Sequence, residues 1–265
     1  MEKYVFFVFY YIFFYGIMQF MSERCFKCFK PKSVCLCKYG KELDPGIKFV
    51  FLMHPKEFRR QRTGTGYLAH VCLKDSEVIV GLDFTKNARF QELLADPQYF
   101  PALMYPGEDA ITADTITVKL AAATSKSAPQ KKLLLIILDA TWFCAKKMIE
   151  HNPFLLQLPK LSFSGSYRSI FTFKREPSPE CISTIECCYY IIKELQAGNF
   201  VDPSLDPEPL MNIFKAMIKL QLTAENERVL GIRTNSHDYD AKYNKIRKIP
   251  KFLDCQVKPD NDTSC

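Results

Sequence analysis

The sequence is poor in tryptophan and histidine, and it contains no internal repeat. Trp142 is the only tryptophan, and four histidines are scattered among 265 residues. The lack of a repeat excludes a solenoid or a propeller. A scattered histidine such as His54 supports neither a metal site nor a catalytic role by itself.

The sequence also lacks a disulfide framework and a secretory signal. Eleven cysteines is an odd number, and the adjacent Cys187 and Cys188 cannot readily form a regular bridge. No small-residue cleavage site follows the aromatic residues 4–21. Reduced thiols explain the cysteine count better than secreted bridges do, so we expect a cytoplasmic protein.

The leader, residues 1–24, contains an uncharged stretch rich in phenylalanine and tyrosine at residues 4–21. As a helix this stretch is about 27 Å long, just enough to span a bilayer. Three explanations remain: a membrane anchor, an aromatic helix packed on the domain, or a translation start at Met18 or Met21. Polar residues interrupt the stretch, so the last two explanations are favoured over membrane contact. In the first case, the basic residues that follow keep the domain in the cytoplasm.

Composition places the rest of the chain among ordinary globular proteins. Apolar residues make up 48% and charged residues 25% of the sequence, which permits a buried core without disulfides. The net charge of +7 comes from 36 basic against 29 acidic residues. This excess suits a polyanionic partner such as RNA but does not establish one.

Short apolar runs alternate with stretches of helical periodicity. We expect strands at residues 47–53, 77–81, 100–105, 133–138 and 158–163, and helices at 90–96, 142–150, 183–196 and 207–223. This alternation predicts an α/β fold with a mostly parallel sheet flanked by helices. We divide the chain into the leader (1–24), a cysteine knuckle (25–40), a catalytic domain (41–225) and a basic tail (226–265) that lies on the surface or is disordered.

Four of the eleven cysteines fall within thirteen residues, spaced as two close pairs. They are Cys25, Cys28, Cys35 and Cys37. Four thiolates in this arrangement suit a tetrahedral zinc ion, which orders segments too small to fold alone. The alternative is four unrelated free thiols. Interleaved lysines permit an RNA contact, although a purely structural role is at least as plausible.

Candidate reactive groups follow the expected strands. Asp139-Ala140-Thr141-Trp142 ends the run 133–138, at the edge where an open α/β sheet presents ligand-binding groups. A Tyr-Pro-Gly turn, residues 105–107, ends another strand at the same edge. After the first strand come the arginines 59, 60 and 62 and a Thr-Gly-Thr-Gly segment, which suit phosphates or simply form a solvated loop.

A capping box is expected at Ser183-Thr184-Ile185-Glu186, where Ser183 and Glu186 satisfy the first N–H groups of a helix. This structural role explains the motif without any catalysis.

Taken together, these motifs resemble the DTW-domain family, the tRNA-uridine aminocarboxypropyltransferases. The matching pieces occur in family order over residues 25–223: the four cysteines, His54-Pro55-Lys56-Glu57, Tyr105-Pro106-Gly107, Asp139-Ala140-Thr141-Trp142, Ser166-Tyr167-Arg168 and Ser183-Thr184-Ile185-Glu186. Cys187 departs from the small residue expected after the last motif. The resemblance implies a fold similar to the SPOUT superfamily, with a knotted cofactor-binding region. It also implies S-adenosylmethionine as donor of a 3-amino-3-carboxypropyl group to N3 of a tRNA uridine.

The resemblance suggests a role for each motif. Asp139 is expected to accept the N3 proton or to orient the sulfonium, Thr141 to fix Asp139 by a hydrogen bond, and Trp142 to stack on the target base or pack beneath the loop. The residues expected to border S-adenosylmethionine are Tyr105, Pro106, Gly107, Leu138, Arg168, Ser183, Thr184 and Glu186. The arginines expected to contact tRNA are Arg59, Arg60 and Arg62.

Two other functions remain open at this stage. One is an RNA methyltransferase that uses the same donor on a related fold. The other is a zinc-knuckle RNA-binding protein whose sheet domain has lost catalysis, against which the intact Asp139 and Trp142 argue.

Overall fold

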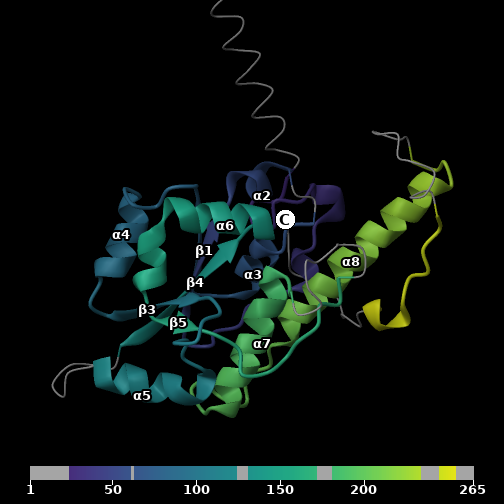
Figure 1. Cartoon of the computed structure of the whole chain (residues 1–265). Coiled ribbons are helices and arrows are strands. Elements are labelled where there is room, and N and C mark those ends of the chain that lie inside the picture. Colours follow the sequence, from purple (N-terminus) through teal and green to yellow (C-terminus); the bar gives the residue numbers. More distant parts are fainter. Residues whose placement is uncertain (1–23, 61–62, 124–130, 172–180, 234–244, 255–265) are drawn as a thin grey trace, which may run out of the picture.

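The centre of the molecule is a sheet of five strands that all run parallel (Figure 1). The computed structural model describes residues 24–60, 63–123, 131–171, 181–233 and 245–254. The strands are β1 (Lys48–Met53), β2 (Ser76–Val80), β3 (Tyr99–Met104), β4 (Lys132–Asp139) and β5 (Lys160–Leu161), in the spatial order β2-β1-β4-β3-β5. The predicted α/β fold with a parallel sheet is confirmed.

Strands β1 and β4 lie in the middle of the sheet, and their sequences show why. Every residue of β1 is buried, and β4 is apolar from Leu133 to Leu138. Strands covered by helices on both faces need such continuous apolar runs rather than alternation. In the register of the two strands Met53 pairs with Asp139, so their carboxyl ends lie side by side.

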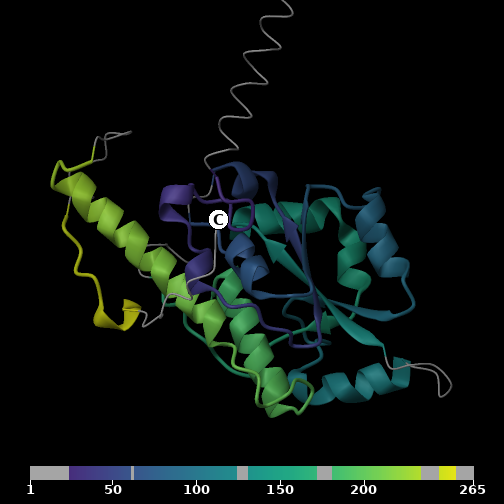
Figure 2. The same cartoon turned by 180° about the vertical axis from the view of Figure 1, so that it is seen from behind.

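Helices cover both faces of the sheet (Figures 1 and 2). One face packs against α4 (Ala88–Ala95), α6 (Trp142–His151) and the 3-10 turn η3 (Pro153–Gln157). The other packs against α3 (Gly66–Cys72), α5 (Ala113–Ala123), α7 (Thr184–Ala197) and α8 (Glu208–Val229). Each face has its own apolar core, which is the arrangement expected of a doubly covered parallel sheet.

Three described helices were not predicted from the sequence. Helix α2 (Pro55–Arg60) and helix α3 are short and lie where the sequence indicated a charged, glycine-containing loop. Helix α5 contains four consecutive β-branched residues, 115–118, which have low helix propensity. It forms because Ile116 and Leu120, four residues apart, are both fully buried against the sheet domain. Tertiary packing therefore outweighs local propensity here.

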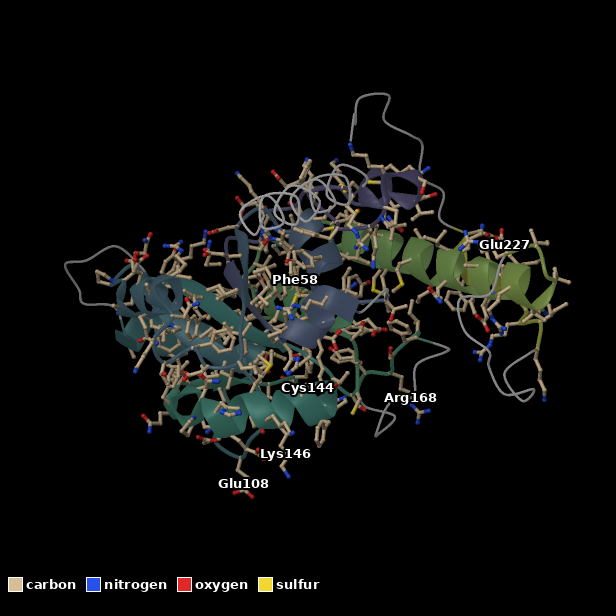
Figure 3. The ribbon with its side chains drawn as sticks, turned by 90° about the horizontal axis from the view of Figure 1, so that it is seen from above. Phe58, Glu108, Cys144, Lys146, Arg168 and Glu227 are labelled. Atoms are coloured by element: carbon tan, nitrogen blue, oxygen red, sulfur yellow. The ribbon has the colours of Figure 1, made fainter. Side chains whose placement is uncertain are left out.

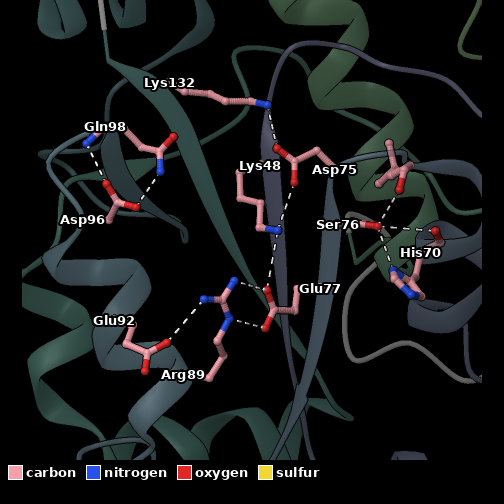
Figure 4. Close-up of polar contacts among 11 residues, drawn as sticks. Lys48, His70, Asp75, Ser76, Glu77, Arg89, Glu92, Asp96, Gln98 and Lys132 are labelled. Carbon is pink, nitrogen blue, oxygen red and sulfur yellow. Dashed lines mark hydrogen bonds and ion pairs between the residues drawn. The ribbon is translucent and has the colours of Figure 1, made fainter.

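The amino ends of the strands carry a network of ion pairs (Figure 4). Lys48 Nζ lies 2.9 Å from Asp75 Oδ1 and 3.5 Å from Glu77 Oε2, and Lys132 Nζ lies 2.6 Å from Asp75 Oδ2. Arg89 donates two hydrogen bonds to Glu77. These bonds lower the pKa of Glu77. Burial opposes ionisation of Asp75, but the hydrogen bonds from both lysines outweigh it and lower its pKa. The lysines at this edge are thus neutralised within the fold.

Part of the basic tail joins the domain. Residues 245–254 run back along α8, where Asn226 exchanges two hydrogen bonds with the backbone of Arg247 and Lys219 pairs with Asp254 (Figure 1). Leu253, in the 3-10 turn η5 (Lys251–Leu253), is fully buried in the core. The rest of this segment lies at the surface, as expected, and Leu253 anchors it to the core.

No helix within the described ranges is long and apolar enough to cross a bilayer. The leader stretch 4–21 lies outside the described residues, so the three explanations for it are untested. The knot implied by the family resemblance likewise stays a prediction.

Candidate active site

Asp139 lies at the carboxyl end of the central strand β4 and is only 4% exposed. Its carboxylate accepts a hydrogen bond of 2.6 Å from the hydroxyl of Thr184, the first residue of α7. Its carbonyl accepts one of 3.0 Å from the N–H of His54, which follows β1. Three segments distant in sequence therefore meet at Asp139.

Gly66, the first residue of α3, packs directly against the Asp139 side chain. A Cβ atom placed there would lie 2.2 Å from Oδ2 of Asp139, closer than real Cβ contacts allow. The absence of a side chain at Gly66 therefore leaves room for the carboxylate of Asp139. The sequence had suggested only that this glycine segment suits a phosphate. The neighbouring Tyr67 is partly buried, and this burial together with the charge of Asp139 raises its pKa to about 12. Neither contact was predicted from the sequence.

His54 serves as a cap for helix α2. Its Nδ1 accepts a 3.0 Å hydrogen bond from the N–H of Lys56, and its carbonyl accepts from Glu57 and Phe58. Burial, followed by the charges of Lys56 and Lys147, lowers its pKa. The imidazole is therefore neutral at pH 7 and carries its proton on Nε2. His54 is therefore a buried residue that caps a helix.

Thr141 and Trp142 begin helix α6. The hydroxyl of Thr141 accepts a 3.4 Å hydrogen bond from the N–H of Cys144, which caps the helix. The hydrogen bond to the Asp139 carboxylate that was expected from Thr141 is donated by Thr184, and the Thr141 hydroxyl accepts the capping bond of α6. Trp142 is 53% exposed, so it does not pack beneath the loop.

The Tyr105-Pro106-Gly107 turn follows β3, beside β4 in the sheet. The N–H of Tyr105 donates to the carbonyl of Leu161 at 3.0 Å, and Pro106 and Gly107 are exposed. A Cβ on Gly107 would lie 3.0 Å from Oδ1 of Asp109. The turn thus stands at the sheet edge that holds Asp139, as the parallel topology requires.

The fully buried carboxylate of Glu186 ties the segment 169–170 to the start of α7. It accepts hydrogen bonds from the N–H and hydroxyl of Ser183 at 2.8 and 2.6 Å, which completes the predicted capping box. It also accepts from the hydroxyl of Ser169 at 2.7 Å and the N–H of Ile170 at 2.8 Å. Arg168, which immediately precedes Ser169, is exposed at the surface (Figure 3).

The four cysteines of the knuckle converge. Cys25 and Cys37 have sulfurs 3.6 Å apart, those of Cys28 and Cys35 are 3.8 Å apart, and all four lie within 4.8 Å of one another. Sulfurs around a tetrahedral zinc ion, each at about 2.3 Å, are about 3.8 Å apart. The cluster therefore has the ligands and spacing that zinc requires.

Aromatic side chains connect this knuckle to the wall of the site. The ring of Phe29, which has a positive φ of 56°, lies 4.4 Å from that of Tyr67 and 6.0 Å from that of Phe58. Tyr67 follows Gly66, the residue in contact with Asp139. The knuckle thus supports the helices that enclose the carboxylate.

The three arginines expected to contact RNA are only partly described. Arg59 is exposed on α2. Arg60 ends that helix, and its side chain, like the whole of Arg62, lies outside the described part of the chain.

Comparisons with known proteins identify the family of the chain. The chain is 22% identical over 234 residues to tRNA-uridine aminocarboxypropyltransferase 2 of Macaca fascicularis, covering 87% of this chain and 76% of that protein. It is 25% identical over 204 residues to the Mus musculus protein of the same name, with 75% and 63% covered, and 24% identical over 182 residues to that of Drosophila melanogaster, with 66% and 67% covered. No solved structure matches it. The DTW domain matches residues 22–222, so the chain belongs to the DTW-domain family.

Proposed function

We propose that the protein transfers the 3-amino-3-carboxypropyl group of S-adenosylmethionine to N3 of a uridine in tRNA. The N3–H bond breaks, a new N3–C bond forms, and the C–S bond to the sulfonium breaks, releasing methylthioadenosine. The observation that carries this proposal is the buried carboxylate of Asp139, held by Thr184 and Gly66 at the carboxyl edge of the sheet. The names of the family relatives supply the substrate class.

Asp139 is the proposed acceptor of the N3 proton. The uridine N3 proton is weakly acidic, so its removal needs a base positioned by its surroundings. The Thr184 hydroxyl fixes one carboxylate oxygen, and the missing side chain of Gly66 lets α3 approach the other. Such fixed geometry is what general-base catalysis requires.

The residues proposed to border the donor lie on neighbouring strand ends and at the start of α7. They are Tyr105, Pro106, Gly107, Leu138, Ser183, Thr184 and Glu186. Arg168 is exposed and is proposed to meet an anionic group, either the donor carboxylate or an RNA phosphate. The tRNA contacts proposed for Arg59, Arg60 and Arg62 place the RNA beside α2. The four cysteines are proposed to hold a structural zinc ion.

The decisive experiment follows two isotopic labels into tRNA. Donor labelled in its carboxyl group should transfer label to tRNA lacking the modification, and donor labelled in its methyl group should not. Methyl label in the RNA would establish a methyltransferase instead. Binding of tRNA without transfer of either label would support the non-catalytic RNA-binding protein.

The same assay tests Asp139. Asp139→Asn keeps a hydrogen-bonding side chain but removes the base, so transfer should fall by about 100-fold or more while tRNA binding persists. RNA with 5-fluorouridine at the target, whose N3 proton is more acidic, should partly restore the rate. Near-normal turnover of Asp139→Asn on uridine would contradict the assignment. A low rate without restoration would indicate that Asp139 orients the sulfonium.

A further inference from the structure

Helix α6 begins with two large aromatic side chains that face solvent. Trp142 is 53% and Phe143 68% exposed, while Cys144 and Met148 on the opposite side of the helix are buried. Two adjacent exposed rings contribute little to the core of the domain. They stand immediately after the strand end that carries the buried Asp139. Rings exposed beside a reactive carboxylate suggest a surface for a planar ligand.

Lysines accompany these rings. Lys146 and Lys147 follow Trp142 and Phe143 at a spacing of four residues, which places each lysine on the same side of α6 as its aromatic partner. Lys147 Nζ lies 4.7 Å from the centre of the Phe143 ring, and Lys146 points outward from the helix (Figure 3). The exposed side of α6 therefore alternates flat apolar groups with positive charge.

The start of α2 extends this surface. Strands β1 and β4 are neighbours, so the helices that follow them begin side by side. The N–H of His54, at the start of α2, donates to the carbonyl of Asp139 just before α6, and Lys56 of α2 and Lys147 of α6 are both exposed. Phe58 on α2 is 45% exposed (Figure 3). We call the surface formed by Lys56, Trp142, Phe143, Lys146 and Lys147 the aromatic platform.

We propose that the aromatic platform binds unpaired RNA on either side of the target uridine. Trp142 and Phe143 stack on the flanking bases, and the three lysines contact phosphates. This inference rests on the proposed function. Because Asp139 is only 4% exposed, a uridine can reach it only after leaving the stack of its neighbours. The bases on either side then lose their stacking contact with the uridine, and the rings of Trp142 and Phe143 replace that contact.

The composition of the platform favours RNA over other anionic partners. Its exposed apolar groups are aromatic rings, which offer faces to bases, whereas a membrane-binding surface usually includes aliphatic side chains. A regular duplex hides its base faces and exposes only their edges. Single-stranded RNA supplies both exposed faces and phosphates, so it fits the platform best.

The single tryptophan makes the stacking directly measurable. Since Trp142 is the only tryptophan, its fluorescence reports on the platform alone. The full chain carrying Asp139→Asn is titrated, without donor, with an RNA hairpin that has uridine in its loop and with a duplex of matched sequence. We expect saturable quenching by the hairpin and little by the duplex. Equal quenching by both, or none by the hairpin, overturns the proposal.

Variants test the remaining contacts. Phe143→Ala should weaken hairpin binding by about 5- to 100-fold, the loss of one stacked base. Replacing Lys146 and Lys147 by alanine should reduce the slope of log affinity against log salt by about 1.4. Phe252→Ala, which removes a ring 52% exposed on η5, is the matched control and should change neither value.

Two outcomes separate this proposal from its rivals. In the first, the parent protein transfers the carboxyl label and the Phe143→Ala variant binds the hairpin as tightly as the parent. This result would overturn the platform and leave the proposed function intact. Quenching by the hairpin in a protein that transfers no label would support the platform and contradict the proposed function. A fluorescence blue shift with phosphatidylserine vesicles, in place of a response to the hairpin, would overturn the platform in favour of a membrane surface.

Discussion

The two ends of the sheet hold their carboxylates in different ways. At the amino ends of β1 and β2, Lys48 lies between the carboxylates of Asp75 and Glu77. At the carboxyl end of β4, the carboxylate of Asp139 accepts a hydrogen bond from the hydroxyl of Thr184. The amino edge thus pairs each of these acids with a cation. At the carboxyl edge, Asp139 accepts a hydrogen bond from the uncharged hydroxyl of Thr184, and the backbone of Gly66 lies close to its carboxylate. Paired charges contribute to stability, while a hydroxyl that donates to a carboxylate fixes its orientation.

The two edges also differ in what surrounds the charge. Large aromatic side chains stand exposed beside Asp139, and the nearby lysines of α2 and α6 extend into solvent. At the amino edge, Lys48 is 8% exposed and is enclosed by its partners. Substitutions at the carboxyl edge should therefore change catalysis, and substitutions at the amino edge should change stability. The following predictions test that separation.

Among substitutions that leave Asp139 itself unchanged, the largest effect on catalysis is expected from Gly66→Ala. The added methyl group would lie 2.2 Å from Asp139 Oδ2, so either the carboxylate or α3 must move. A displacement of this size should lower kcat/KM for tRNA by about 100-fold. Steady-state transfer of the carboxyl label measures it. Gly46→Ala, at a position with open space but a φ of +71°, is the control: it should destabilise the fold slightly and leave kcat unchanged.

Cys28→Ser tests the proposed zinc site. Removing one of four thiolates should reduce bound zinc to nearly none from the one ion per chain proposed for the parent protein, measured by mass spectrometry of metals. Phe29 of the knuckle packs on Tyr67 of α3, so loss of the metal should loosen α3 beside Asp139. The variant should therefore transfer the label more slowly, and the amide protons of α3 should exchange faster. The ion pairs at the amino edge should be unaffected. Full activity in a zinc-depleted protein would contradict this link.

Thr184→Val should impair catalysis without unfolding the protein. It removes the 2.6 Å hydrogen bond to Asp139 while keeping the shape of the side chain. A bond to a charged group is worth about 1.5–3 kcal/mol, so kcat should fall by about 10- to 100-fold with little change in KM for tRNA. Thr184→Ser retains the hydroxyl and should restore most of the rate. Equal rates for the valine and serine variants would remove Thr184 from this role.

Lys48→Met tests the opposite edge. It leaves Asp75 and Glu77 with their other partners, Lys132 and Arg89, so the expected loss of stability is about 1–3 kcal/mol. The midpoint of urea denaturation measures this loss. At 25 °C the folded variant should transfer the label at the normal rate, and a large drop in kcat would contradict the separation of the two edges.

The smallest effect concerns the pH dependence of stability at His54. Its pKa is lowered in the folded protein, so its contribution is present in full above the ordinary value of 6.5 and is lost as pH falls through the folded value. Asparagine can accept the same hydrogen bond without titrating. His54→Asn should therefore lose less stability between pH 7 and pH 5 than the parent protein, as judged by urea midpoints.

The sequence predicted those parts of the fold that local pattern determines. The uninterrupted apolar run of β4 identified the central strand, and Ser183 with Glu186 identified the start of α7 to the residue. The spacing of the four cysteines predicted their convergence. In each case the residues that decide the structure lie close together in the chain.

The contacts around Asp139 could not be predicted in the same way. Thr141 lies two residues from Asp139, yet its hydroxyl caps α6, and Thr184 reaches the carboxylate from 45 residues away. Gly66 was visible in a glycine-containing segment, but nothing local to that segment indicates a carboxylate partner. Helix α5 shows the same limit, because its β-branched run favours a strand until packing is considered.

The wide spacing of Gly66, Asp139 and Thr184 has a consequence for synthesis on the ribosome. β4 can pair with β1 and β3 as soon as it emerges, because all three strands precede α7 in the chain. The hydroxyl that orients Asp139 arrives only with α7, after a further loop has closed. A nascent chain can therefore build most of its sheet before it has a functional site. Translation stalled before α7 should leave an ordered but inactive intermediate.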